Sequence, residues 1–143
     1  MIQKSKVISY IFRKNRQEIL VFDHRDFPEA GTQVIGGTVE EGEEGGDLRF
    51  ALTREVLEES GLALDAHLFF PIGQSTFHRT DKPEINLRNY FGFDSDKLTI
   101  QLPEKWSHEV SSSGEDNALV FHFYWLMAAQ AKNVLVGNFG EFL

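Results

Sequence analysis

Residues 36–62 read GGTVEEGEEGGDLRFALTREVLEESGL, which is a glycine turn followed by an acidic loop and a carboxylate-rich segment. The ends of that segment carry helix signals. Asp47 is a good N-cap, residues 48–60 contain no Gly or Pro, and Gly61 suits the left-handed position that often ends a helix. These signals predict an α-helix over residues 48–60.

One side of this helix mixes apolar and acidic residues. At about 100° per residue, Leu48, Ala51, Leu52 and Val56 form an apolar sector. Glu55 and Glu59 project into that sector, and Glu58 lies at its edge. Carboxylates at these spacings repel one another and are costly to bury unless a positive charge neutralises them. Mg²⁺ or Mn²⁺ would neutralise them, because both ions prefer oxygen ligands.

The alternative is a solvated helix, since Glu-rich helices usually lie on the surface. Four features favour a metal site instead, the first being that the glutamates share a face with core residues. The glutamates follow Arg54, which could orient one of them, and they are closed off by Gly61. A Gly-Gly turn joined to a plausible strand at residues 32–35 precedes them.

This stretch resembles the signature of the Nudix hydrolases, G-x5-E-x7-R-E-U-x-E-E-x-G-U, in which U is aliphatic. Gly37 and Glu43 match the first half, with five residues between them. The second half matches at Arg54, Glu55, Val56, Glu58, Glu59, Gly61 and Leu62. Ten residues separate Glu43 from Arg54 where the family has seven, so the loop before the helix is longer.

Counting back from Arg54, Gly46 occupies the position where the family has its loop glutamate. Because glycines are permissive loop residues, we interpret the difference as an insertion that keeps the helix register. Either Glu43 or Glu44 could then be the acid that lies close to the metals or their waters.

The resemblance implies roles for the matched residues. Glu58 and Glu59 would be the main metal ligands, joined by the backbone carbonyl of Gly37. Glu55 would bind a further metal or help to deprotonate water, and Arg54 would orient the glutamates. The implied reaction is hydrolysis of a phosphoanhydride bond in a nucleoside diphosphate linked to another moiety, by metal-activated water that attacks phosphorus.

A further acidic ligand outside the signature is common in the family. Residues 114–117, Gly-Glu-Asp-Asn, lie between two predicted strands and offer Glu115 and Asp116, of which we favour Glu115. An ordinary polar hairpin loop is the alternative, because Gly, Asp and Asn are turn formers.

The composition is that of a single globular domain over residues 1–143. Hydrophobic residues make up 41% of the chain, which is enough for one core, and no secretory or membrane-length apolar segment occurs. With no cysteine, disulfides, thiolate zinc sites and cysteine nucleophiles are excluded. A net charge of -8 without a Lys/Arg stripe argues against nucleic-acid polymers and anionic membranes as partners. We expect a cytoplasmic protein, and the resemblance allows a homodimer.

Strand patterns surround the helix. Strands are predicted at residues 6–13, 18–24, 32–39, 66–70, 75–79, 87–93, 109–112 and 118–127, and a terminal helix at residues 128–143. Gly137 and Gly140 argue against a regular helix at that end. The pattern is α+β, and the resemblance narrows it to the Nudix fold, an α/β/α sandwich around a mixed β-sheet.

Substrate contacts are harder to select. Candidates for phosphate binding are Arg25, Arg79 and Arg88, and candidates for an acid or phosphate donor are His24, His78 and His108. Candidates for stacking a base are Tyr90, Phe27, Phe77 and Trp106, although aromatic residues on strands are more often core. The expected substrate is a small nucleotide, with dinucleoside polyphosphates or nucleoside triphosphates leading.

Three rival functions remain. A catalytically silent Nudix-like domain that senses a nucleotide is favoured only by the lengthened loop. An isoprenoid diphosphate isomerase of the same fold would need a reactive cysteine, and the chain has none. A plain acidic interaction module would neither bind Mn²⁺ at Glu58 and Glu59 nor release phosphate.

Overall fold

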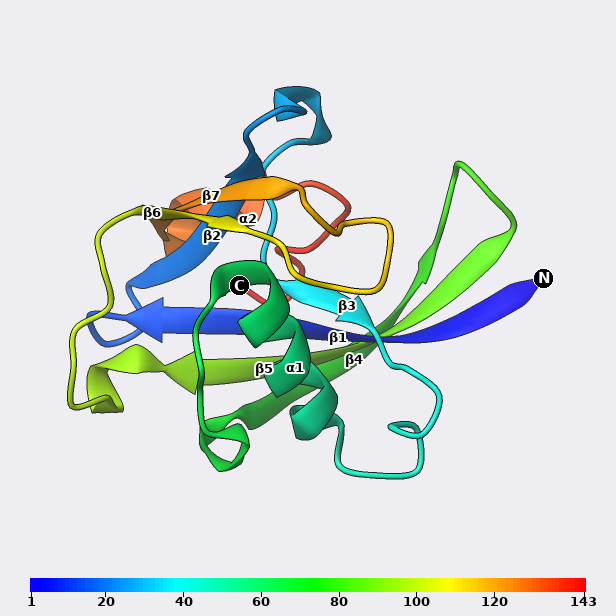
Figure 1. Ribbon diagram of the computed structural model, residues 1–143, viewed down its shortest axis with the longest axis horizontal. Coiled ribbons are helices and arrows are strands. Elements are labelled where there is room, and N and C mark those ends of the chain that lie inside the picture. The colour runs from blue at the N-terminus through cyan, green and yellow to red at the C-terminus, as the bar shows by residue number, and fades with distance from the viewer.

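The computed structural model describes residues 1–143, in which two α-helices and short 3-10 turns surround one seven-stranded sheet (Figure 1). The strands are β1 (Ile2–Arg13), β2 (Glu18–His24), β3 (Gly36–Thr38), β4 (Phe70–His78), β5 (Glu84–Asp94), β6 (Trp106–Glu109) and β7 (Val120–Met127). The helices are α1 (Leu48–Ser60) and α2 (Ala128–Val134).

The sheet is mixed and has the strand order β4-β5-β1-β2-β7-β6. The β1 and β5 strands are parallel, from Ile2 opposite Glu84 to Phe12 opposite Asp94, and the other pairs are antiparallel. The second edge of β1 is shared. Its C-terminal end pairs with β2, and its N-terminal half pairs with β3, so that Gly37 lies opposite Val7.

Alternation along β1 supplies both faces of the sheet. Val7 and Ile11 belong to a core cluster of 16 buried residues that includes the apolar side of α1. Ile8 and Tyr10 belong to a second cluster of 9 residues that includes Ala131 of α2. One helix therefore covers each face, which confirms the predicted α/β/α sandwich around a mixed sheet (Figure 1).

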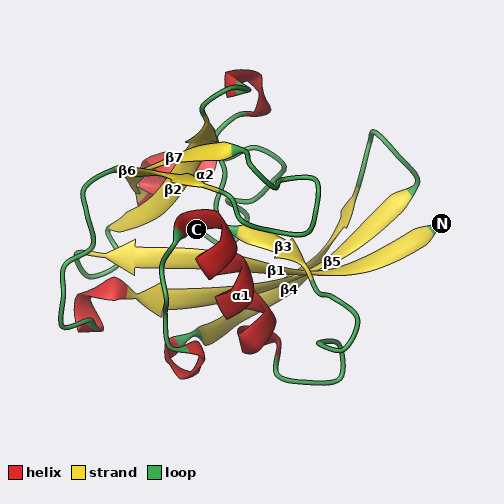
Figure 2. Cartoon of the chain, viewed as in Figure 1, coloured by secondary structure: helices red, strands yellow, loops and turns green.

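The α1 helix has the predicted bounds, and its caps explain them. The Asp47 side chain accepts a hydrogen bond from the Arg49 amide, and Gly61 has φ +79 and ends the helix. Figure 2 shows the long loop that joins β3 to α1. This loop contains the three additional residues inferred from the sequence.

Several predicted elements were wrong. Residues 66–70 are not a strand, because Asp65 caps a 3-10 turn at Ala66–Leu68 and β4 begins only at Phe70. The strand predicted at residues 32–39 is reduced to β3 and an isolated bridge at Gln33. The strand predicted at residues 109–112 lies earlier, as β6.

The predicted terminal helix stops at Val134. Gly137 and Asn138 both have φ +60, which a right-handed helix does not allow. The segment that follows is held by side chains of the sheet, since the Tyr10 hydroxyl donates to the Phe139 carbonyl. No helix of the protein is long and apolar enough to cross a membrane.

Candidate functional site

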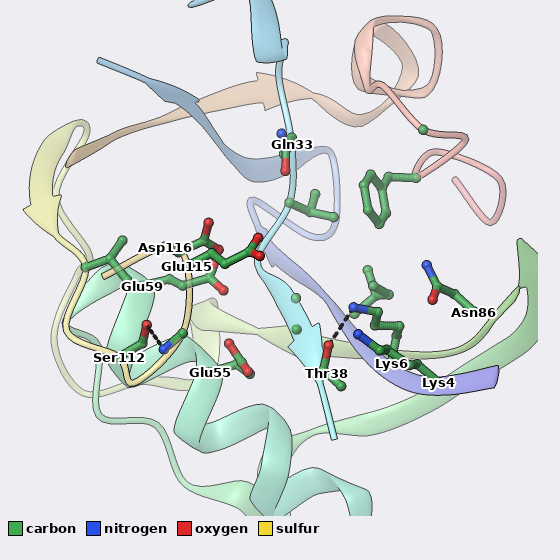
Figure 3. Close-up of a pocket in the computed structure, with 18 of the residues that line it drawn as sticks. Lys4, Lys6, Gln33, Thr38, Glu55, Glu59, Asn86, Ser112, Glu115 and Asp116 are labelled. Atoms are coloured by element: carbon green, nitrogen blue, oxygen red, sulfur yellow. Dashed lines mark hydrogen bonds between the residues drawn. The ribbon is translucent and has the colours of Figure 1, made fainter. Parts of the chain in front are cut away.

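A cleft of about 910 Å³ contains the carboxylates of α1. Several other parts of the chain line it: the N-terminal half of β1 with β3, the end of β2, the facing ends of β4 and β5, the loop before β7, and residues 137–139. Figure 3 shows Glu55 and Glu59 on one side of this cleft and Lys4, Lys6 and Asn86 on the other. The cleft thus has an acidic wall and a wall rich in cations.

Gly37 allows α1 to approach β3 closely. A Cβ at this position would lie 2.1 Å from Cδ of Glu55 and 2.2 Å from its Oε1. The Glu55 carboxylate therefore lies directly against the backbone of Gly37. Only a residue without a side chain permits this contact, which explains the glycine that the signature requires there.

Arg54 binds the acidic residues around it. Its Nε and Nη2 donate to the two carboxylate oxygens of Glu43 at 2.9 and 3.0 Å. Its Nη1 donates to Glu55 at 3.0 Å and to Glu58 at 3.2 Å. Nη2 also donates to the carbonyl of Thr38 at 3.1 Å, which ties α1 to β3. Arg54 thereby holds the loop, the helix and the strand in one arrangement.

The longer loop brings Glu43, and not Glu44, to Arg54. One carboxylate oxygen of Glu43 also accepts a hydrogen bond from the Glu40 amide at 2.8 Å, and the Arg54 hydrogen bonds lower the pKa of Glu43. Glu44 is exposed to solvent. Nothing lies within 4 Å of a Cβ at Gly45, whereas a Cβ at Gly46 would lie 3.7 Å from the Glu43 carbonyl oxygen. The helix after this loop keeps the predicted bounds, Leu48–Ser60.

Glu55 and Glu59 are buried acids that share a site. Glu59 is only 5% exposed, and its pKa is raised well above the ordinary value. The main cause is burial, and the second is repulsion from Glu55. Burial also raises the pKa of Glu55. Two carboxylic acids in one low-dielectric site favour their neutral forms unless a cation is present.

The donor set fits a hard divalent cation. Glu55, Glu58 and Glu59 supply carboxylate oxygens at one end of an open cleft, and the Gly37 backbone lies against Glu55. No group of three or more His, Asp or Glu side chains is already arranged around one point as a ligand set. Glu55 and Glu58 both accept hydrogen bonds from Arg54.

The loop before β7 places both Glu115 and Asp116 at the cleft, and both side chains are exposed (Figure 3). Of the two, Asp116 is the one whose negative charge adds to the raised pKa of Glu59. The Glu58 carbonyl accepts a hydrogen bond from the Ser111 amide, so this loop is tied to the end of α1.

The cation-rich wall has its charges mostly paired. Glu84 is 3.2 Å from Lys4 and 3.4 Å from Arg79. Lys6 differs, because its Nζ donates to the Thr38 hydroxyl at 2.5 Å and makes no ion pair. Burial lowers the pKa of Lys6, while Glu84 and Glu55 oppose that shift. Lys6 is thus the partly buried cation of the cleft that lacks a carboxylate partner.

The predicted substrate contacts divide into two groups. Arg79, Arg88, Phe77 and His24 line the cleft. The others lie outside it: Arg25, Tyr90, Phe27, Trp106, His78 and His108.

Each residue outside the cleft has a local role or none. Arg25 is exposed and pairs with Asp26. Tyr90 is buried and donates its hydroxyl proton to Glu141 at 2.7 Å. Trp106 stacks on Phe123 and donates to the Ser60 carbonyl, so it belongs to the core.

Lys6 and Asn86 were missed from the sequence. One face of β1 contains Lys4, Lys6, Ile8 and Tyr10. The alternation of side chains along this strand therefore indicates that two lysines lie on the same face as buried residues, and this pattern could have identified Lys6. For Asn86 no such signal exists, because its neighbours across the sheet come from distant parts of the chain.

Solved structures with the same architecture belong to Nudix proteins. The E. coli dihydroneopterin triphosphate pyrophosphohydrolase superposes with a TM-score of 0.64 at 20% identity, covering 99% of this chain and 96% of that one. The MutT protein from Methanosarcina mazei Go1 gives 0.65 at 18% identity, over 99% and 90% of the two chains. The NUDIX domain of Shewanella oneidensis NrtR, solved in complex with ADP ribose, gives 0.60 at 13% identity, over 99% and 84%.

At these identities the likeness shows the fold alone. No curated protein matches the chain. The family model described as NUDIX domain, however, matches residues 3–136.

The fold and the carboxylate helix therefore define a domain of the Nudix hydrolase class. Because the family model spans nearly the whole chain, the chain belongs to the Nudix family. Members of this family act on nucleoside diphosphates linked to another moiety and generally need divalent metal ions.

Proposed function

We propose that this chain hydrolyses a phosphoanhydride bond of a nucleotide with the help of Mg²⁺ or Mn²⁺. Glu55, Glu58, Glu59 and the Gly37 carbonyl would hold the cation, with Glu115 or Asp116 as an additional ligand. When bound, the cation would neutralise charge on the phosphates and activate a water for attack on phosphorus. The new bond joins the water oxygen to phosphorus, and the P–O bond to the leaving phosphate breaks.

The observation that carries this proposal is that three α1 carboxylates line one end of a cleft whose other wall holds cations. A polyphosphate substrate needs a metal site and additional cations. Its charge is neutralised at the reacting bond by the metal and further along the chain by groups such as Lys6. A solvated acidic surface would not require Glu59 to be 5% exposed.

The residues of the chain have distinct proposed roles. Arg54 orients Glu55 and Glu58 through its hydrogen bonds and is itself held by Glu43. Glu55 either binds a second metal or takes the proton of the attacking water. Lys6 faces the cleft without a carboxylate partner and can contact phosphate oxygens, whereas Arg79 is paired with Glu84.

The leading substrates are dinucleoside polyphosphates and nucleoside triphosphates. The cleft volume of about 910 Å³ lies within the range of nucleotide-sized sites. Two structurally similar proteins add compounds to test, because one is named for dihydroneopterin triphosphate and another was solved with ADP ribose.

The test is phosphate release across a panel of these compounds, with Mg²⁺, Mn²⁺ or EDTA. We expect turnover of one class that EDTA abolishes. Glu58→Gln should lose most of this turnover while its circular dichroism spectrum stays that of the wild type. Exposed Glu109, which lies on β6 outside the cleft, provides the matched control Glu109→Gln. Unaltered activity of Glu58→Gln at saturating Mg²⁺ would contradict the assignment.

A catalytically silent nucleotide sensor is the second candidate. It is favoured by the long loop and by the way Arg54 occupies Glu55 and Glu58 in the structure. Thermal stabilisation by a nucleotide without phosphate release across the panel would support the sensor instead of the hydrolase.

Three further proposals concern the whole protein. We infer that residues 1–143 act as one domain, that the protein is cytoplasmic, and that it is able to form a homodimer. A single cooperative unfolding transition, cell fractionation, and light scattering after size-exclusion chromatography test these proposals in turn.

A further inference from the structure

Asn86 has a buried side chain whose hydrogen-bonding capacity is not used within the protein. It is 6% exposed, lines the cleft, and its Oδ1 has no hydrogen-bond partner. A buried polar atom without a partner destabilises the fold, so such atoms are rare in folded proteins and point to a function. The only other one here is Nδ1 of His24, whose ring packs on Phe121.

The surroundings of Asn86 favour a neutral ligand. Across the sheet, Lys4 lies beside it on β1 and Phe77 lies beside it on β4. The charge of Lys4 is paired with Glu84, which also pairs with Arg79. An anionic group at Asn86 would therefore meet a carboxylate as well as cations.

The wall next to Asn86 is rigid. Arg88 is two residues further along β5, on the same face. Its guanidinium is held between the rings of Phe77 and Phe139, at 3.9 and 4.1 Å from their centroids, and donates to the Gly137 carbonyl at 2.6 Å. A ligand beside Asn86 thus meets a guanidinium that is already held in place.

Lys6 lies between the two ends of the cleft, one formed by the α1 carboxylates and the other by Asn86. Lys6 lies opposite Arg88 on the neighbouring strand, and its Nζ donates to the hydroxyl of Thr38 on β3. Figure 3 shows the two lysines between Glu55 and Asn86. Phosphates that reach from the α1 carboxylates to Lys6 would leave the rest of a nucleotide at Asn86.

We propose that Asn86 determines specificity by binding the heterocyclic base of the substrate through its side-chain amide. An amide presents an N–H donor next to an oxygen acceptor and so matches a base edge in which an acceptor adjoins a donor, as in adenine or guanine. This inference rests on the proposed function, because it takes the ligand to be a nucleotide with its phosphates at the α1 carboxylates.

The first test uses nucleoside monophosphates, which have no anhydride bond to hydrolyse. AMP, GMP, purine riboside 5′-monophosphate and ribose 5-phosphate are titrated with Mg²⁺ into ¹⁵N-labelled protein, and the Asn86 side-chain amide is followed by NMR. We expect AMP or GMP to shift this signal and to bind about tenfold tighter than the purine riboside compound, which lacks the donor. An unshifted Asn86 signal, or an equal shift with ribose 5-phosphate, would overturn the proposal.

The second test uses variants. Asn86→Leu should lose the preference for AMP or GMP over purine riboside monophosphate and should bind ribose 5-phosphate as the wild type does. Asn86→Gln keeps the amide and should restore part of the preference. Asn133→Leu removes an exposed amide at the end of α2 and serves as the control. A preference that persists in Asn86→Leu would contradict the role.

The two proposals fail separately. Monophosphate binding at Asn86 without phosphate release from any compound of the panel would overturn the hydrolase and leave the base site standing. Phosphate release with an unshifted Asn86 signal would support the hydrolase and overturn the base site at Asn86.

Discussion

The carboxylate of Glu43 accepts two hydrogen bonds from Arg54, at 2.9 and 3.0 Å, across a loop that is longer than the one in the family signature. The insertion therefore does not break the contact between the loop and the helix. Glu44, the next residue, is exposed. Glu43 is therefore the loop acid that binds Arg54, and the role of Glu43 or Glu44 beside the metals stays a prediction.

Glu43→Gln should lower the free energy of unfolding of the protein, and Glu44→Gln should leave it unchanged. Loss of the Glu43 charge removes its partly exposed ion pair with Arg54. Such pairs typically contribute about 1 kcal/mol to the free energy of unfolding. Denaturant unfolding of both variants measures this difference. Equal stability of the two variants would show that the contact with Arg54 contributes nothing.

Gly37→Ala should impair metal binding more than it destabilises the fold. The added Cβ would meet the carboxylate of Glu55, which is the mobile end of a side chain and can move away. Displacement of the Glu55 carboxylate would remove one ligand of the cation, so the Mg²⁺ affinity should fall by about tenfold or more. Gly45→Ala is the matched control, because nothing lies within 4 Å of its Cβ. Identical Mg²⁺ titrations of the two variants would contradict this expectation.

Removal of divalent metal should lower the melting temperature of the wild type. A cation held by Glu55, Glu58 and Glu59 binds only the folded state, and at 100 times its dissociation constant it adds about 2.7 kcal/mol. Glu59→Gln should abolish most of this Mg²⁺ response. Without metal the variant should be at least as stable as the wild type, because a buried acid has been replaced by a neutral group. A full Mg²⁺ response in Glu59→Gln would remove Glu59 from the ligand set.

Asp116→Asn should weaken Mg²⁺ binding more than Glu115→Gln, because the Asp116 charge is the one that reaches Glu59. From the sequence alone we favour Glu115. Isothermal titration of each variant with Mn²⁺ compares them directly. A larger loss in Glu115→Gln would restore the original choice, and no loss in either would make residues 114–117 an ordinary loop.

Asp47 should make stability depend on pH below about pH 4. Hydrogen bonds from Arg49 lower the pKa of Asp47 to about 2, from 3.8. A lowered pKa means that the folded state favours the ionised form. The resulting stabilisation is complete above the unfolded pKa and is lost as the pH falls through about 2.

Asp47→Asn keeps an N-cap and removes the charge. The difference in unfolding free energy between wild type and variant should be present at pH 7 and pH 5 and should shrink by pH 3. Denaturant titrations followed by circular dichroism measure it. A difference that is constant over this range would exclude the ionic contribution.

Local sequence information predicted α1 and its caps correctly, since a cap, a helical run and a closing glycine interact over a few residues. Helical periodicity also placed Glu55 and Glu59 on the buried side of that helix, with Glu58 at its edge. The same local reasoning failed at residues 66–70, where Asp65 caps a 3-10 turn, and beyond Val134, where tertiary contacts hold the chain.

The amino-acid sequence by itself established the helix, the carboxylates it carries and the class of chemistry they fit, because helix capping and side-chain periodicity are local. The tertiary structure decided which loop acid reaches Arg54 and which groups face the carboxylates across the cleft. Lys4 and Asn86 become neighbours only through the parallel pairing of β1 with β5. That register depends on burial over the whole sheet and not on either segment alone.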